Sequence, residues 1–144
     1  MTKLLITGPR EIKDRIWVKL NMFLYLDENK NITVLISGNA VGVDQLAEDA
    51  VRIYNINLER RNSKRPAIKI HRERPKYAIY GKPAPFIRNQ TMVDMADECL
   101  ALHNGKDGGT ADTIKKAKKK GIPISIVLYP DRYEKTDNNL KKWL

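Results

Sequence analysis

The chain has 144 residues, enough for one compact domain that buries most of the apolar surface of its unfolded form. No stretch approaches the roughly 18 apolar residues of a membrane span, and nothing at the N-terminus is typical of a signal peptide, so we expect a soluble, cytoplasmic protein without a membrane partner. The single cysteine, Cys99, excludes an internal disulfide, and with only two histidines, His71 and His103, we expect no metal site and no structural zinc.

The net charge of +10 is unevenly distributed along the chain. Residues 59–82 carry nine Lys or Arg against two Asp or Glu, whereas residues 1–58 are balanced and residues 83–144 have an excess of three positive charges. Such a cationic block attracts phosphate, whether in nucleic acid, in a nucleotide or in another anionic partner. The competing interpretation is that this block is a solvated, variable connecting segment. Composition by itself favours neither a phosphate-binding patch nor a connecting segment.

Apolar patterning predicts strands that alternate with helices. Short apolar or β-branched runs indicate strands, and apolar residues at three- and four-residue spacing indicate helices. In chain order we expect a strand over residues 3–7, a helix over 11–25 with Pro9 or Arg10 near its first turn, a strand over 31–37, a helix over 43–54, a strand over 66–71, a long loop over 72–85, a helix over 86–96, a strand over 98–103, a helix over 110–120, a strand over 122–129, and a short amphipathic helix with Leu140, Trp143 and Leu144.

This alternation implies right-handed crossovers between parallel strands. We therefore predict an α/β fold: a single Rossmann-like domain, with a mainly parallel sheet of about five strands and helices on both faces. The domain spans residues 1–144, with a basic insert at about 59–82 and a short C-terminal tail at about 131–144. The strand over 66–71 is less apolar than the others, so we expect it nearer a sheet edge.

Three glycine-containing loops follow predicted strands. They are "TGPRE" after the first strand, "SGNAVGVD" after the second and "HNGKDGGT" after the fourth. Ligands of open parallel sheets bind beyond the carboxyl ends of the strands, and we expect each loop to open a helix whose free N–H groups favour an anion. A glycine that only permits a turn is the competing interpretation of each loop, but three loops on one edge favour a shared anion site.

Several polar side chains are expected at the same edge. Asp44 either caps the second helix or binds a ribose hydroxyl, and capping is the favoured role. Thr110 is a candidate N-cap whose hydroxyl can also contact phosphate. Because the helix dipole disfavours a cation near a helix N-terminus, we interpret Arg88 with Asn89 as a phosphate or carboxylate contact, with a salt bridge to an acid as the alternative. Arg10 can approach the same edge from the first loop.

Signals for catalysis are weak. No Ser-His-Asp order, HExxH motif or Walker Lys-Ser pair is present. We interpret Cys99 as a core residue and His103 as an ordinary polar residue at a strand end rather than a ligand contact. Of the acids expected near the edge, Asp44, Asp107 and Asp112, we keep Asp44 and Asp112 as weak catalytic candidates.

The segments "TGPRE", "SGNAVGVDQLAEDA" and "APFIRNQTMVDMADECLALHNGKDGGTADTIKKAKKKGIPI", in this order, resemble the SLOG superfamily and within it the branch related to YspA and YpsA, often found in bacteria and their phages. The resemblance covers nearly the whole chain apart from the basic insert and the tail. It implies a Rossmann-like fold with a pocket for a nucleotide or nucleotide-derived ligand and no cofactor. Related proteins often assemble, which implies a homodimer or another homo-oligomer.

The same resemblance implies a ligand-binding set. Matched motif by motif, the set comprises Gly8, Arg10, Ser37, Gly38, Gly42, Asp44, Arg88, Asn89, Gly108, Gly109 and Thr110. The superfamily includes DprA and the LOG phosphoribohydrolases, which release a base from a nucleoside monophosphate by means of a PGGxGTxxE motif. Thr113 stands where that glutamate would fall, and a threonine cannot act as a carboxylate base. Asp112 is adjacent, but one residue along a helix turns the side chain by about 100°.

Three functions therefore stay open. The first is a sensor or sequestering protein that binds a nucleotide or nucleotide-derived small molecule. The second is an N-glycosidic hydrolase or transferase that acts on nucleotides, with Asp44 or Asp112 as its acid. The third is DprA-like nucleic-acid binding through residues 60–76. Thr113 favours binding over hydrolysis.

Overall fold

Strands and helices alternate throughout the computed structural model, which describes residues 1–134. In chain order the elements are β1 (Thr2–Thr7), α1 (Arg15–Glu28), β2 (Ile32–Ser37), α2 (Val43–Arg60), β3 (Lys69–Arg72), α3 (Tyr77–Tyr80), α4 (Ala84–Met95), β4 (Glu98–His103), α5 (Gly109–Lys120) and β5 (Ile124–Leu128). The tail helix expected from Leu140, Trp143 and Leu144 lies outside the described residues.

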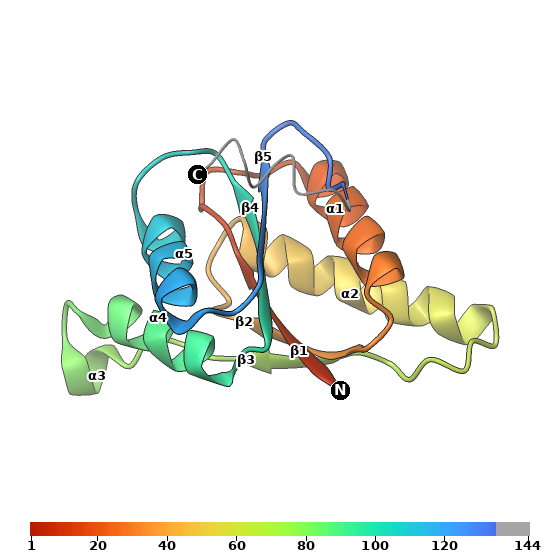
Figure 1. Ribbon diagram of the computed structural model, residues 1–144, viewed down its shortest axis with the longest axis horizontal. Coiled ribbons are helices and arrows are strands. Elements are labelled where there is room, and N and C mark those ends of the chain that lie inside the picture. The colour runs from red at the N-terminus through yellow and green to blue at the C-terminus, as the bar shows by residue number, and fades with distance from the viewer. Residues whose placement is uncertain (135–144) are drawn as a thin grey trace.

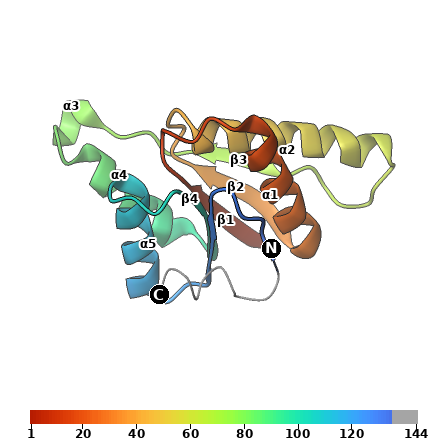
Figure 2. The same ribbon diagram turned by 90° about the horizontal axis from the view of Figure 1, so that it is seen from above.

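The five strands form one parallel sheet in the order β3-β2-β1-β4-β5. Helices α1 and α2 pack together on one face of this sheet, and α4 and α5 pack together on the other (Figures 1 and 2). The predicted α/β fold is confirmed, and β3 lies at an edge, as its lower apolar content indicated. The strand order reverses beside β1, so the carboxyl ends of β1 and β4 mark the topological switch point, where ligands of such sheets bind.

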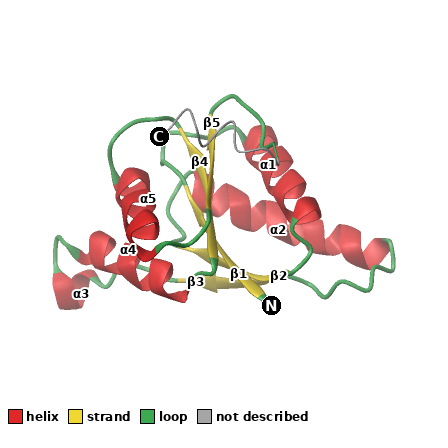
Figure 3. Ribbon diagram, in the orientation of Figure 1, coloured by secondary structure: helices red, strands yellow, loops and turns green. Residues whose placement is uncertain are grey.

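Alternate residues of β1 supply two separate cores. Leu4 and Ile6 pack with the α1 and α2 side, whereas Leu5 packs with the α4 and α5 side. Because both faces of the sheet are covered (Figure 3), successive residues in the middle of the strand must be apolar, which explains the continuous run from Leu4 to Ile6. Cys99 is fully buried in the second core, and burial raises the pKa of its thiol to about 12, so its interpretation as a core residue is confirmed.

Helix α1 begins four residues later than expected from apolar spacing. Its N-cap is Asp14, whose Oδ1 accepts a hydrogen bond from Trp17 N at 3.0 Å. A side chain that satisfies a free N–H group stabilises a helix start more specifically than periodicity does. The expectation that Pro9 or Arg10 lies in the first turn is therefore wrong, and both belong to the loop before the helix.

The expected loop over residues 72–85 also contains regular structure. Its middle forms the helical turn α3, and α4 begins at Ala84, two residues earlier than predicted. Pro85 lies in the first turn of α4, where the missing N–H group of proline costs nothing. Arg88 consequently lies beyond the first helical turn, so the dipole-based reason for expecting an anion beside it is wrong.

The basic segment over residues 59–82 comprises parts of several elements. It includes the end of α2, the edge strand β3 and the turn α3. Arg65 in this segment has a structural role: its guanidinium donates to Leu26 O at 2.7 Å, to Asn29 O at 3.1 Å and to Ile32 O at 3.2 Å. It also donates to the Tyr54 hydroxyl at 3.0 Å and lies 5.4 Å from the centre of that ring. One cation of the block therefore ties the end of α1 to the start of β2.

Candidate functional site

A cavity of about 630 Å³ lies at the carboxyl edge of the sheet. Its walls come from the segments that follow β1, β2, β3 and β4, together with α4 and the start of α5. This volume is within the range of small-molecule sites, roughly 300–1,000 Å³. The described part of the chain thus has a ligand-sized cavity at the switch point of its sheet.

Most of the residues singled out in the sequence line this cavity. The lining includes Gly8, Arg10, Gly38, Asp44, Arg88, Asn89, Gly108, Gly109, Thr110 and Thr113. Ser37, Gly42 and Asp112 are not among the lining residues. Their contacts with the rest of the protein explain why these three positions are polar or lack a side chain.

Ser37 and Gly42 shape the second loop from behind the cavity. The Ser37 hydroxyl donates to Glu48 Oε2 at 2.8 Å and is fully buried. Gly42 has a φ of +96°, and a methyl group there would lie 2.6 Å from Pro9 O. Gly42 therefore permits a left-handed turn and lets the first loop cross the second, because any side chain would collide with that backbone.

Asp112 is held by one residue of α4 and by one residue of its own helix, α5. Its Oδ2 accepts from Asn89 Nδ2 at 3.0 Å and from Lys116 Nζ at 2.5 Å. The adjacent Thr113 lines the cavity, and its hydroxyl donates to Gly109 O at 3.0 Å. At Thr113 the cavity therefore meets a hydroxyl that is already hydrogen-bonded to its own helix, and the adjacent acid, Asp112, is ion-paired with Lys116.

The N-terminus of α5 differs from those of α1 and α2. Among the described residues, its first N–H groups are bonded neither to a capping side chain nor to a neighbouring loop. At α2, Val43 N donates to Pro9 O at 3.4 Å, and α1 begins far from its glycine loop with its own cap. Helix α5 begins at Gly109 without a side-chain cap, and a methyl group on Gly108 or Gly109 would meet no heavy atom within 4 Å. Thr110 lies inside the first turn of α5, so its predicted role as N-cap is wrong. The start of α5 is therefore a helix N-terminus at the cavity with no side-chain cap from residues 1–134, and such N–H groups favour an anion in general.

Asp44 is a buried acid in the cavity wall. Its side chain makes no cap for α2, which corrects the favoured expectation; instead Oδ2 accepts from Ala40 N at 3.2 Å. Asp44 is only 6% exposed, and its Oδ1 has no hydrogen-bond partner among the described residues. Burial raises the pKa of Asp44 to about 7, although the nearby Arg88 charge opposes this shift. A buried acceptor without a donor costs about 1–3 kcal/mol, which a ligand donor would recover.

Arg88 holds the loop after β2. Its Nη1 donates to Gly38 O at 3.0 Å and to Glu73 O at 3.3 Å, and its Nε donates to Asn89 Oδ1 at 3.0 Å. Within residues 1–134 Arg88 has no ion pair, and Nη2 makes no hydrogen bond to the protein. The guanidinium is thus oriented by backbone carbonyl groups while one end can still receive an anion.

Glu48 is a buried residue behind the cavity wall, and sequence patterns did not single it out. Its Oε2 accepts from Ser37 Oγ and Asn39 Nδ2, each at 2.8 Å, and its Oε1 accepts from Arg72 Nε at 2.6 Å. Burial by itself would raise the pKa of Glu48, but the hydrogen bonds from Asn39, Ser37 and Arg72 outweigh it and lower the pKa. Glu48 lies one turn after Asp44 on an otherwise apolar helix face, and this unexpected carboxylate is the signal available in the sequence.

The cavity combines cations with apolar surface. Its charged lining comprises Arg10, Arg74, Arg88, Lys106, Glu11, Asp44 and Asp107. Pro85, Met92 and Tyr77 add apolar and aromatic contacts. His103 also lines the cavity, and burial lowers its pKa, which favours the neutral imidazole. Such a set can hold a phosphate, a polar hydroxyl-bearing group and a flat ring in one ligand.

The chain is thus a Rossmann-like α/β domain with a ligand-sized cavity at the switch point of its sheet. No family model matches the sequence. The chain is 32% identical over 128 residues to the Gene 61 protein of Mycobacterium phage D29, with 86% of this chain and 94% of that protein covered. It therefore belongs to the same family as this phage protein. No helix among residues 1–134 is both long enough and apolar enough to cross a membrane.

The fold is similar to that of DNA processing protein A, DprA. The Streptococcus pneumoniae protein matches 96% of this chain with a TM-score of 0.61 and 15% sequence identity. The Helicobacter pylori protein matches 98% of this chain with a TM-score of 0.57 and 19% sequence identity. The chain spans 53% of the first protein and 72% of the second. The expected likeness to DprA is thus confirmed for the fold.

Proposed function

We propose that the protein binds a nucleotide or a nucleotide-derived small molecule in this cavity, as a sensor or a sequestering protein. The observation that carries the proposal is the buried Oδ1 of Asp44, which lacks a partner among the described residues and lines the same cavity as the uncapped start of α5. A ligand hydroxyl would satisfy the first group and a phosphate the second. A nucleotide offers both on adjacent parts of one molecule.

The two ends of the cavity suggest a division of roles. The N–H groups at Gly109 and Thr110, with Arg88 Nη2, receive the phosphate. Asp44 accepts a hydrogen bond from a ribose hydroxyl. The apolar side near Tyr77 and Met92 faces the base. Free phosphate leaves Asp44 unpaired and a nucleoside leaves the helix N-terminus empty, so each should bind more weakly than the nucleotide.

Two contacts support binding over N-glycosidic cleavage. The Thr113 hydroxyl donates to a carbonyl of its own helix, and the Asp112 carboxylate is paired with Lys116. Neither group is a free carboxylate at the cavity. The motifs shared with the SLOG superfamily support the same nucleotide-binding proposal, and they also suggest a homodimer.

A second candidate function is binding of single-stranded nucleic acid. Residues 74–87 border the cavity and contain three Lys or Arg residues and no Asp or Glu. The H. pylori DprA, which shares the fold, binds single-stranded DNA. Here the cavity would receive one nucleotide of a strand, while residues 74–87 would contact the phosphates beside it.

The small-molecule proposal is tested first by mass spectrometry of any compound that copurifies. Thermal unfolding with a panel of nucleotides, inorganic phosphate and nucleosides then follows. A nucleotide at 100 times its Kd should stabilise the fold by about 2.7 kcal/mol and raise Tm by several degrees. The proposal fails if no nucleotide at millimolar concentration stabilises the protein more than phosphate does.

A further inference from the structure

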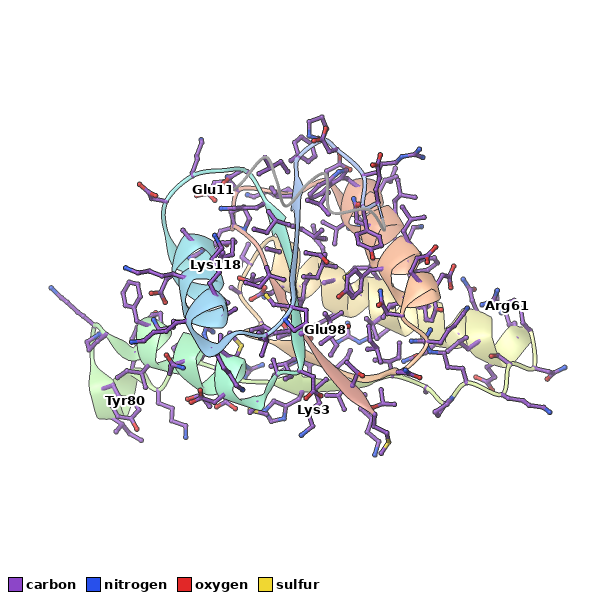
Figure 4. The ribbon with its side chains drawn as sticks, viewed as in Figure 1. Lys3, Glu11, Arg61, Tyr80, Glu98 and Lys118 are labelled. Atoms are coloured by element: carbon purple, nitrogen blue, oxygen red, sulfur yellow. The ribbon has the colours of Figure 1, made fainter. Side chains whose placement is uncertain are left out.

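An exposed segment with aromatic residues projects from the domain beside the cavity. We call residues 74–87, which include α3 and the first turn of α4, the aromatic arm. Its exposed fractions are 59% for Tyr77, 70% for Ile79, 45% for Tyr80 and 51% for Phe86, and α3 has no buried residue. In two perpendicular views α3 lies at one end of the molecule, away from the sheet, and Tyr80 lies at the periphery (Figures 1, 2 and 4).

The charge of the aromatic arm restricts what can cover it. Arg74, Lys76 and Lys82 are its only charged residues, and none of them forms an ion pair with the described part of the protein. Lys116, which is ion-paired with Asp112, lies 5.7 Å from the centre of the Phe86 ring. A second copy docked symmetrically on the arm would bring these like charges together, whereas a polyanion would neutralise them.

The arm is also held in shape before any partner binds. Pro75, Pro83 and Pro85 restrict its backbone. Gly81 ends α3 with a φ of +66°, and its N–H donates to Tyr77 O at 2.8 Å. A partner would therefore meet exposed rings on a stiff support, which lowers the entropic cost of association.

We propose that the aromatic arm is a base-stacking surface for single-stranded nucleic acid, with the strand passing from Tyr80 and Tyr77 towards the cavity. This inference rests on the second candidate function above. Unpaired bases offer flat faces to aromatic rings, and their phosphates meet the lysines between those rings. In a duplex the same faces are stacked on neighbouring bases. Tyr77 belongs to both the arm and the cavity lining, so it connects the two surfaces.

The test is fluorescence anisotropy of labelled oligo-dT, oligo-U and a DNA duplex with the full chain. Tyr77→Ala and Tyr80→Ala should each weaken binding of the single strands roughly 5- to 150-fold. Tyr77→Phe and Tyr80→Phe should bind like the parent, because stacking needs the ring and not the hydroxyl. The control is Ile79→Ala, which removes an even more exposed apolar side chain of α3 that has no ring, and it should change binding less than about 2-fold.

Salt dependence separates the two kinds of contact. Lys76→Gln should reduce the slope of log K against log salt by about 0.7, the value for one phosphate contact on a single strand. Tyr80→Ala should leave that slope unchanged and leave mononucleotide binding unchanged, since Tyr80 does not line the cavity. Comparison of oligo-dT with oligo-U identifies which strand is preferred, and stacking predicts binding of both.

The outcomes distinguish the inference from the function on which it rests. If the parent binds no single strand at low salt, the nucleic-acid function itself is rejected. If the parent binds and the alanine variants bind equally well, the function stands and the arm is excluded as its site. If Ile79→Ala weakens binding as much as Tyr80→Ala, and both break up a parent dimer in sedimentation, a second copy covers the arm and the inference is overturned.

Discussion

Asp44 and Arg88 meet at Gly38: a methyl group on Gly38 would lie 2.6 Å from Arg88 Nη1 and 3.1 Å from Asp44 Oδ2. The absence of a side chain at this position lets a cation from α4 and a buried acid from α2 share one part of the cavity wall. Arg88 also donates to Gly38 O at 3.0 Å, so it supports the loop as well as the cavity. Arg88→Ala should consequently lower the stability of the free protein as well as its affinity for ligand.

Asp44→Asn should change how stability depends on pH. The pKa of Asp44 is about 7 in the folded protein and about 3.8 when unfolded, so between these values the folded state holds a proton that the unfolded state has released. The free energy of unfolding of the parent should therefore fall, relative to that of Asp44→Asn, by up to about 1.4 kcal/mol per pH unit as pH rises towards 7. Urea unfolding of both proteins from pH 5 to 9 measures this difference, which should level off above about pH 8.

The same substitution should change the pH dependence of nucleotide affinity. A ligand hydroxyl bonds more strongly to the ionised carboxylate, so the parent should bind more tightly as pH rises through 7. At pH 8 Asp44→Asn should bind roughly 10- to 150-fold more weakly, the equivalent of one hydrogen bond to a charged group. Titration calorimetry of the parent and of Asp44→Asn with the same nucleotide measures both affinities. Ionisation of the nucleotide affects both proteins equally, so it cancels when the two pH profiles are compared. Parallel pH profiles would show that Asp44 does not contact the ligand.

Gly109→Val should reduce nucleotide binding with little effect on folding. No heavy atom lies within 4 Å of a side chain at Gly109, so the valine fits the protein but occupies the approach to the N–H groups of α5. Gly109→Ala should give a smaller loss of affinity. The contrasting variant is Gly108→Val, which forces a φ of +139° on a β-branched residue and should lower Tm as well. Equal stabilisation by ligand in Gly109→Val and the parent would exclude the phosphate end of the cavity.

Glu48→Ala should destabilise the second loop and the end of β3. The change leaves Ser37 and Arg72 without their shared acceptor, and we expect a loss of roughly 2–3 kcal/mol. Because the pKa of Glu48 is lowered in the folded state, this stabilisation is present above pH 4.5 and is lost as pH falls through the folded pKa. Chemical unfolding at pH 7 and pH 3 measures both effects.

The matched control for Glu48 is Arg52→Ala. Arg52 contacts the same carboxylate at 3.5 Å, but half of its side chain is exposed. Surface pairs of this kind contribute about 0–1 kcal/mol, so the control should be nearly neutral. If the two substitutions cost the same, the buried hydrogen bonds of Glu48 are not what holds the loop.

Arg65→Gln and Lys64→Gln should have different effects on stability, because Arg65 is hydrogen-bonded to the protein and Lys64 is exposed to solvent. Arg65 donates to three backbone carbonyl groups, and its loss should cost at least about 2 kcal/mol. Lys64 is exposed, and its substitution should change stability by less than about 0.5 kcal/mol. Thermal unfolding gives the comparison. A neutral Arg65→Gln would contradict the structural role of this cation.

Much of the fold was predictable from the sequence because buried strands and amphipathic helices leave local patterns. The strand over residues 98–103 was predicted with its observed bounds, since a strand covered on both faces has a continuous apolar run, here Cys99 to Leu102. The start of α1 was not, because Asp14 had to be recognised as a cap. The turn α3 was also missed, because its exposed side chains carry no amphipathic period.

The sequence by itself determined that the chain is an α/β domain and that glycine loops meet at one edge of its sheet, because periodicity and turn residues act over a few neighbouring positions. Only the tertiary structure decided which of these groups a ligand can reach. It covered the start of α2 with Pro9, placed Asn89 of α4 beside Asp112 and brought no described side chain to cap the start of α5. It also buried Asp44 without a partner for one oxygen. Burial and pairing depend on residues far apart in the chain, so no local pattern records them.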